Sequence, residues 1–236
     1  MRDYEGLERL FIDNLGLERR PVTITFRDSV PLDVPAFTGA EPAGCGFWRL
    51  AAGGQVFYTR PEDHYNCPIG SYTHNIPLPP ERRNELDDTL GLMTGIGYLR
   101  MEEVPGIARL ERTPSAIVYA PLAKSPVDPD VVLFAGRPGS MMLLQEAALR
   151  AGAPAGQSLF ARPTCMAIPA ALTNGVVASN GCIGNRVYTE IGGDEMYVAL
   201  PGNDLDRIAS EVKTVAAANA RLAEYHRARL HQLRTE

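Results

Sequence analysis

Four cysteines stand in two pairs with similar surroundings, and their residue type and spacing suggest metal chemistry. Cys45 and Cys67 form the first pair, and Cys165 and Cys182 form the second. Thiolates are soft ligands, which suit zinc or an iron–sulfur cluster. The cysteines are therefore the first candidates for a functional site.

The surroundings of the two pairs indicate an internal duplication. When Cys45 is placed on Cys165, other residues also match, and after a short deletion Cys67 falls on Cys182. The further matches are Ala51 with Ala171, Val56 with Val176, Ile69-Gly70 with Ile183-Gly184, and Tyr72-Thr73 with Tyr188-Thr189. Self-similarity of this kind is typical of a repeated structural unit. We expect one domain over 1–236, built from two repeat halves (about 7–110 and 111–233) around a pseudo-two-fold axis.

The spacing within each pair distinguishes between kinds of metal site. The second cysteine follows the first by 22 residues in one pair and by 17 in the other. Structural zinc sites usually take their ligands from much closer C-x2–4-C knuckles. A cubane cluster can instead take four thiolates from separate loops, and a two-fold repeat supplies two from each half. The sequence therefore predicts one [4Fe–4S] cluster held by Cys45, Cys67, Cys165 and Cys182.

Residues next to the cysteines fit this prediction. Pro68 follows Cys67 directly, and Cys-Pro is frequent at cluster ligands, where proline stiffens the loop. Glycines also lie near the cysteines and allow the backbone to approach a bulky inorganic core. They are Gly44, Gly46, Gly70, Gly181 and Gly184.

Other interpretations of the cysteines remain open. Unligated cysteine is a common small core residue, and a pair of thiols can also undergo redox chemistry. Haem or zinc are further alternatives as cofactors. A disulfide within one pair would favour disulfide chemistry over metal binding.

Polar residues near the cysteines are candidates for a second layer of contacts. His64 and His74 flank Cys67, where they would serve as ligands, acid–base groups or hydrogen-bond partners of a cluster, unless they are merely solvated. Arg49, Arg162 and Arg186 would bind an anion or balance cluster charge, unless they form ordinary surface ion pairs. We expect His64, His74 and Arg186 to surround the cluster, with partners approaching from the His64 side.

Composition limits the classes of function. Hydrophobic residues make up 45% of the 236-residue chain, as in an ordinary globular protein, and the net charge is -5. An acidic chain argues against nucleic-acid binding, which favours a basic face. The sequence shows neither an apolar run of ~20 residues nor a secretory signal, so we expect no membrane insertion. We therefore expect a cytoplasmic protein with reduced or metal-bound thiols.

The hydrophobic patterns predict a mixed α/β fold with interleaved helices and strands. Thr59–Tyr72 is polar and is expected to be irregular. Helices are predicted over Tyr4–Leu15, Pro79–Leu92, Ser140–Arg150, Ala167–Leu172 and 204–233, and strands over Val22–Phe26, Ala116–Tyr119, Val131–Phe134, Val176–Ala178 and Met196–Leu200. Trp48–Tyr58 is expected to contain a short helix followed by a strand, separated at Gly53-Gly54.

Three segments that carry the cysteines resemble a known family. They are C…A-x2-G-G…H-Y-N-C-P-I-G, A-R-P-T-C-M-A-I-P and S-N-G-C-I-G-N-R. This set is similar to the bacterial and archaeal family catalogued as domain of unknown function 169, over nearly the whole chain from about Leu7 to Leu233. The resemblance implies no reaction or cofactor, and it points only to the four cysteines as notable positions.

These observations lead to two functional hypotheses. The first is a cytoplasmic iron–sulfur protein for electron transfer or redox sensing, because full cysteine ligation leaves no open iron for Lewis-acid chemistry. The alternative is a redox enzyme that binds a small ligand and uses reactive thiols or haem, with His64 or His74 as the acid–base group. The expected partner is a redox protein in the first case and a small-molecule substrate in the second.

Overall fold

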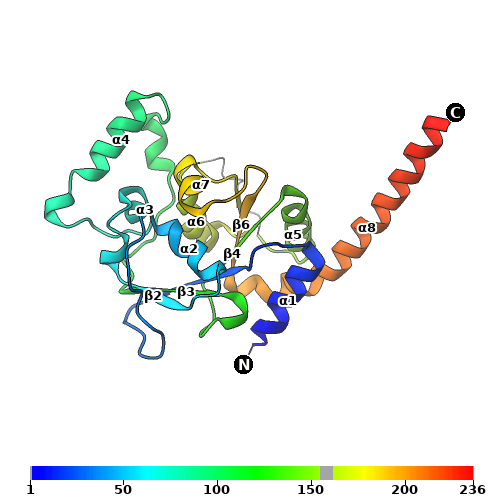
Figure 1. The fold of residues 1–236 in the computed structure, drawn as a ribbon, viewed down its shortest axis with the longest axis horizontal. Helices are drawn as coiled ribbons and strands as arrows, with labels where there is room; N and C mark the ends of the chain where they lie inside the picture. The colour runs from blue at the N-terminus through cyan, green and yellow to red at the C-terminus, as the bar shows by residue number, and fades with distance from the viewer. Residues whose placement is uncertain (1, 155–161, 236) are drawn as a thin grey trace.

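The computed structural model describes residues 2–154 and 162–235 as a mixed α/β fold around one antiparallel sheet (Figure 1). The strand order in this six-stranded sheet is β2-β3-β1-β4-β6-β5, and every pair of neighbours is antiparallel. The strands are β1 (Val22–Arg27), β2 (Phe57–Thr59), β3 (Ala116–Pro121), β4 (Val131–Gly136), β5 (Val177–Ser179) and β6 (Met196–Pro201).

Helices cover both faces of the sheet, which explains why its central strands are apolar on both sides. Along β4, Val132 and Phe134 belong to one hydrophobic core, whereas Val131 and Leu133 belong to another. This alternation follows from the two-residue period of a β-strand. The continuous β-branched run that predicted a strand is therefore a strand buried on both faces.

The first core lies beneath three helices. These are α1 (Tyr4–Leu15), α5 (Pro138–Arg150) and the first half of α8 (Leu205–Thr235). Phe11 of α1, Leu144 of α5 and Ile208 of α8 are fully buried there. These helices stabilise the sheet from the side that carries no cysteine.

The second core lies beneath α2 (Gly44–Ala52) and α6 (Ala167–Asn174). Phe47 of α2 and Ile168 of α6 are fully buried against this face. Two short helices, α3 (Pro68–Thr73) and α7 (Ile183–Thr189), lie on the same side, and α2 packs against both of them. All four cysteines belong to this layer.

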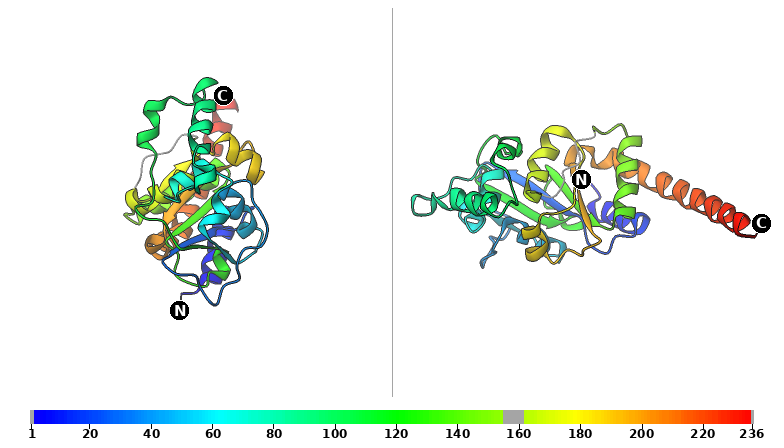
Figure 2. Two further views of the ribbon diagram at one scale, coloured as in Figure 1. Left: turned by 90° about the vertical axis from the view of Figure 1, so that its left-hand side faces the viewer. Right: turned by 90° about the horizontal axis from the view of Figure 1, so that it is seen from above.

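Two parts of the molecule project from its body (Figures 1 and 2). Helix α4 (Glu85–Gly95) projects at one end of the long axis, together with the turn that follows it, and the second half of α8 projects at the other. In the described part of the chain, no helix combines the length and apolar character needed to cross a membrane. Short 3-10 helices connect the larger elements: η1 (Pro61–His64), η2 (Pro80–Arg82), η3 (Met101–Gly106), η4 (Leu122–Lys124), η5 (Thr164–Met166) and η6 (Gly202–Asp204).

The sequence predicted most of these elements, but it missed two helices. Helix α1 and the predicted strands β1, β3, β4, β5 and β6 are confirmed to within two residues at their ends. The prediction that Thr59–Tyr72 is irregular is wrong, because this segment contains η1 and most of α3. Helix α7 was also missed. The predicted helix over Pro79–Leu92 begins later, at Glu85, since Pro79 and Pro80 precede a separate 3-10 turn.

Candidate functional site

The four cysteines line one pocket of about 360 Å³. None of them forms a disulfide. Their mutual proximity is also evident at Cys165, because a charge on Cys67, Cys182 or Cys45 would raise the pKa of its thiol. The structure thus brings together two pairs that lie about a hundred residues apart in the sequence, and it places them on the side of the sheet covered by α2 and α6.

Each cysteine stands at the beginning of a helix. Cys45 is the second residue of α2, and Cys165 lies in η5, which leads directly into α6. Cys67 and Cys182 are the N-cap residues of α3 and α7. Backbone turns, rather than flexible loops, therefore position all four sulfurs.

Two of the sulfurs accept hydrogen bonds from the backbone. The Gly70 N–H donates to Cys67 Sγ at 3.3 Å, and the Asn185 N–H donates to Cys182 Sγ at 3.4 Å. In both helices the donor is the third residue after the cysteine, the position from which an N-cap side chain usually receives a hydrogen bond. Such bonds favour a thiolate over a thiol and fix the direction of the sulfur.

Glycine is favoured at one position close to each of these cysteines. A Cβ atom on Gly70 would lie 3.1 Å from Cys67 Sγ, closer than ordinary packing permits. Gly181, which precedes Cys182, has a φ of +80°, and a Cβ there would lie 3.0 Å from Asn185 Oδ1. Two of the glycines singled out in the sequence thus have a steric role next to the sulfurs.

Burial strongly favours the neutral thiols in the absence of a cation. It raises the pKa of Cys45 to about 12, with a smaller contribution from the nearby Cys67. Burial is also the largest cause of the raised pKa of Cys67 and of Cys165. The cysteines therefore become stable thiolates only when a positively charged group in the site compensates their charge.

His74 is part of the pocket and is buried, not solvated as the polar sequence around it allowed. It is 2% exposed and lines the same pocket as the cysteines. Its Nδ1 lies 2.9 Å from Gly70 O, which assigns the proton to Nδ1 and leaves a lone pair on Nε2. Nε2 has no hydrogen-bond partner among the described residues. Burial lowers the pKa of His74 to about 4, so the ring is neutral at pH 7.

His64 lies behind the pocket. It is 1% exposed, its Nε2 is 2.8 Å from Thr59 Oγ1, and its ring stacks on His74 with centroids 5.8 Å apart. Its Nδ1 lies 3.2 Å from the place where a Cβ on Gly44 would be, immediately before Cys45. Burial, followed by the neighbouring His74, holds the pKa of His64 well below its usual value. The two histidines therefore form one buried layer.

Asn185 is a site residue that the sequence analysis did not identify. Its side chain is 2% exposed and lines the pocket. Neither Nδ2 nor Oδ1 has a hydrogen-bond partner of good geometry among the described residues, although the Cys45 thiol and the Tyr197 hydroxyl lie close to this amide. A buried amide without partners costs free energy, which suggests that a bound group completes its hydrogen bonds. The available signal was its position three residues after Cys182, which matches the position of Gly70 after Cys67.

The arginines occupy different places. Arg186 is not among the residues that line the cysteine pocket, and its guanidinium donates to the carbonyl oxygens of Gly192, Asn180 and Glu195. The structure therefore does not bring it to the cysteines. Arg162 does line the pocket, where it stacks over the Tyr98 ring at 4.9 Å and pairs with Glu103 at 3.0 Å.

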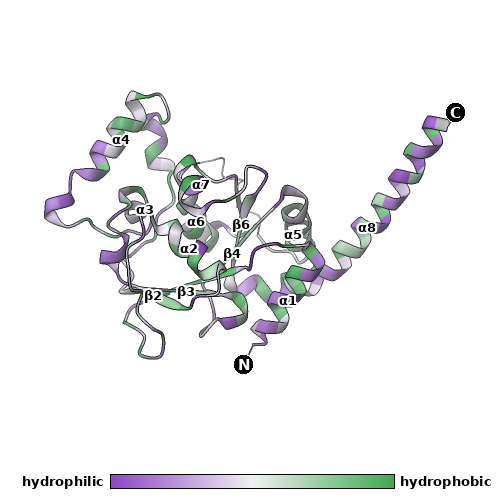
Figure 3. Ribbon diagram, in the orientation of Figure 1, coloured by the Kyte–Doolittle hydropathy of each residue, from purple (hydrophilic) through white to green (hydrophobic). Residues whose placement is uncertain are grey.

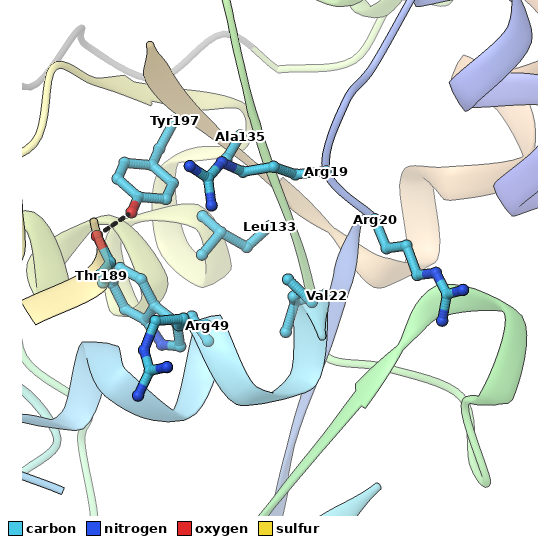
Figure 4. A pocket seen from close by; sticks show the side chains of 10 residues that line it. Arg19, Arg20, Val22, Arg49, Leu133, Ala135, Thr189 and Tyr197 are labelled. Carbon is cyan, nitrogen blue, oxygen red and sulfur yellow. Dashed lines mark hydrogen bonds between the residues drawn. The ribbon is translucent and has the colours of Figure 1, made fainter. Parts of the chain in front are cut away.

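Arg49 borders a different and much smaller cavity of about 30 Å³ behind the site (Figure 4). It pairs with Glu41 at 3.4 Å. Figure 4 also shows the hydroxyl groups of Tyr197 and Thr189, which are 3.1 Å apart. Thr189 in turn donates to Asn185 O, so this cavity borders the supports of α7.

The remaining wall of the pocket is apolar and comes mainly from α4 and the segment after it. It includes Leu90, Met93, Tyr98, Leu99 and Ile107. Ile183 and Tyr188 of α7 complete the rim and are 62% and 40% exposed. The pocket thus has a sulfur-lined base and an apolar wall, which is the character of a water-poor ligand site.

The donor set does not form a site for one ion. Among residues 2–154 and 162–235, no group of three or more His, Cys, Asp or Glu side chains is arranged to hold a single metal ion. A tetrahedral zinc site requires its ligands to converge on one atom. An iron–sulfur cluster instead binds each thiolate at a different iron, so its ligands stand farther apart.

Comparisons with known proteins identify a family but no characterised relative. No curated protein and no solved structure matches the chain significantly. Residues 11–211 match the family model of DUF169, which is described as uncharacterised ArCR. This match includes all four cysteines, both buried histidines and Asn185. Because it spans most of the chain, the protein belongs to the DUF169 family.

Proposed function

We propose that this protein binds one [4Fe–4S] cluster through Cys45, Cys67, Cys165 and Cys182, and that it serves in electron transfer or redox sensing. The observation that carries the proposal is the convergence of four free cysteines on one pocket. These are all the cysteines of the chain. When bound, such a cluster supplies a one-electron redox couple, and the chain holds, shields and tunes it.

The proposal includes the duplication inferred from the sequence. The strand order from the edge to the centre is β2-β3-β1 on one side and β5-β6-β4 on the other. The pairing registers also agree. Val22 faces Pro121 as Val131 faces Pro201, and Tyr119 faces Phe57 as Ala199 faces Val177. Matching both order and register in two unrelated halves by chance is improbable.

A two-fold axis would pass between β1 and β4 at the centre of the sheet. There Val22 faces Leu133 and Ile24 faces Val131, an arrangement that is symmetric about the pair Thr23 and Val132. Rotation about this axis would exchange α2 with α6 and α3 with α7. Each half would then contribute two cysteines to a single cluster near the axis.

The chemical surroundings of the sulfurs also support a cluster. Backbone N–H groups already donate to Cys67 and Cys182, and N–H···S bonds are among the features that set a cluster's potential. The unpartnered amide of Asn185 lies in the same pocket and is suited to donate to a cluster sulfide. His74 and His64 exclude water behind Cys67 and complete the surrounding layer.

Electron transfer follows from the ligand set. Four thiolates would occupy the available coordination position on each of four irons, which leaves none for a substrate. Disulfides are rare in the cytoplasm, so the expected location would keep all four thiols available as ligands. A redox partner would approach the rim formed by α4 and α7, where Ile183 is exposed beside Cys182.

A redox enzyme that binds a small ligand is the second candidate. It is favoured by the apolar wall of the pocket and by Arg162, whose guanidinium lines that wall. The raised pKa values of Cys45, Cys67 and Cys165 argue against thiolates as its nucleophiles, since reactive cysteines have lowered values. Haem would remain as its cofactor, and a sharp Soret absorption band would reveal it.

The test is anaerobic reconstitution with ferrous iron and sulfide, followed by optical and electron paramagnetic resonance spectroscopy. The wild type should show broad absorption near ~400 nm. Each of Cys45→Ser, Cys67→Ser, Cys165→Ser and Cys182→Ser should lose most of it, because serine is a harder and weaker ligand. Ala52→Ser, which adds a hydroxyl at the far end of α2, is the matched control. Four variants with undiminished absorption would refute the assignment.

A further inference from the structure

The second half of α8 leaves the body of the protein with an exposed apolar stripe. We call residues 216–234 the α8 tail. Its large apolar residues are far from buried: Leu222 is 55% exposed, Tyr225 59%, Leu230 49% and Leu233 61%. At helical spacing, Leu222 and Leu233 continue the face on which Val215 packs into the core. The exposed apolar side chains therefore alternate with polar ones along the tail, which makes it an amphipathic surface (Figure 3).

The α8 tail is also basic. It contains Arg221, Arg227, Arg229 and Arg234 but only one acidic residue, Glu224. Arg229 lies four residues before Leu233 and seven after Leu222, which places it on the apolar stripe. Arg221, Arg227 and Arg229 form no ion pair with another described residue. A complementary surface should thus be apolar and acidic.

Helix α4 at the other end of the molecule has this character. Leu92 is 65% exposed and Ile96 70%, and their spacing of four residues places them on one face. Asp88 lies four residues before Leu92 on the same face, and Asp87 is beside it. Both aspartates are exposed and form no ion pair within the described part of the chain. Apolar and charged residues alternate along α4 as they do along the α8 tail (Figure 3).

We propose that the protein is a homodimer in which the α8 tail of each chain packs on α4 of the partner. Within one chain the two surfaces project from the same side of the body but at opposite ends of its long axis, so they do not meet (Figure 1). A second copy related by a two-fold axis brings each tail to the partner's α4. The contact then forms twice and closes the assembly.

Charge distinguishes this arrangement from the obvious alternative. Two α8 tails packed on each other would bring together two stripes with four arginines and one glutamate each, and like charges destabilise such pairs. The α4 surface supplies the opposite charge together with apolar area. Since α4 also provides Leu90 and Met93 to the wall of the cysteine pocket, the partner's tail would cover the outer side of that wall.

The test uses full-length variants and light scattering coupled to size-exclusion chromatography. The wild type should have twice the chain mass of 25.7 kDa. Asp87→Lys/Asp88→Lys and Arg221→Glu/Arg229→Glu should each be monomeric at low micromolar concentration. Their equimolar mixture should recover dimers, as should all four substitutions in one chain, because both contacts regain opposite charges. Asp13→Lys/Glu62→Lys, which changes the net charge equally at two exposed positions elsewhere, should stay dimeric.

Several outcomes would overturn the proposal. A monomeric wild type excludes it directly. A dimer that resists reversal of Asp87 and Asp88 but dissociates on reversal of Arg221 and Arg229 assigns the contact to another surface, such as a second tail. The proposal is also wrong if both variants are folded by circular dichroism but their mixture forms no dimers, because the opposite charges would then not pair the α8 tail with α4.

Discussion

The cysteines, of which Cys45 is buried and the other three are half-buried, lie at a site where isolated thiolates are unstable. Cys45 has a pKa of about 12 because burial penalises its charged form, and Cys67 and Cys165 are shifted in the same direction. Compensation by a cationic inorganic core would reverse this penalty. The sequence drew attention to all four residues, since their type and the similar surroundings of the two pairs were visible. It did not identify Asn185, because an amide signals nothing until its burial and lack of partners are known.

The first prediction concerns the amide of Asn185. Removing a donor to the cluster destabilises the reduced, more negative state, so Asn185→Ala should lower the reduction potential by on the order of 50 mV. Iron content should remain that of the wild type. The measurement is a spectroelectrochemical titration, with Asn180→Ala at an exposed position as the control. Identical potentials in the two variants would argue against Asn185 as a donor.

The second prediction concerns the pH dependence of the metal-free protein. The pKa of His74 is about 4 in the folded state, below its ordinary value of 6.5, and that of His64 is also lowered. Between these values the unfolded chain binds protons that the native state does not. The free energy of unfolding should therefore fall as pH drops from 6.5 to 4, by up to about 1.4 kcal/mol per pH unit for each histidine.

Urea denaturation at several pH values would measure this slope. His74→Gln removes one of the two titrating groups and should flatten the pH dependence between 6.5 and 4. A slope unchanged by the substitution would mean that His74 is not held neutral in the folded protein. Well above pH 6.5 neither histidine should contribute to the pH dependence of the free energy of unfolding, because both rings are neutral in the folded and the unfolded state.

At the scale of elements, α3 and α7 show where sequence patterns fail. Both helices are short and begin with cysteine as the N-cap, a residue that is not a usual helix-start signal. Under the proposed repeat, Thr73 corresponds to Thr189, and each hydroxyl donates to a backbone carbonyl one turn earlier, Gly70 O and Asn185 O. Longer elements such as α1 were predictable, because their periodicity extends over several turns.

The third prediction compares two glycines in helices. Gly70→Ala in α3 places a Cβ 3.1 Å from Cys67 Sγ and should reduce iron occupancy severalfold by displacing that sulfur. Gly91→Ala in α4 meets nothing within 4 Å and should instead raise stability by about 0.5–1 kcal/mol through helix propensity. Iron analysis and thermal melting distinguish the two. Full occupancy in Gly70→Ala would mean that the Cys67 position is not critical.

At the scale of the whole molecule, the architecture explains how cysteines from two distant parts of the chain come to line one pocket. The composition and strand patterns predicted the mixed α/β class, and the order of the sheet could not be deduced from them. It depends on the central pairing of β1 with β4, which places Thr23 opposite Val132, 109 residues further along the chain, and no local signal encodes such contacts. In the proposed account this pairing carries the axis, and the cysteines of both halves meet beside it.

The most direct test of this account is the amount of iron and acid-labile sulfide in protein purified without oxygen. We expect about four of each per chain, and close to none in Cys45→Ser/Cys182→Ser, which removes one ligand from each cysteine pair. Protein that contains neither iron nor sulfide after anaerobic purification and reconstitution, while folded with all four thiols reduced, would contradict it.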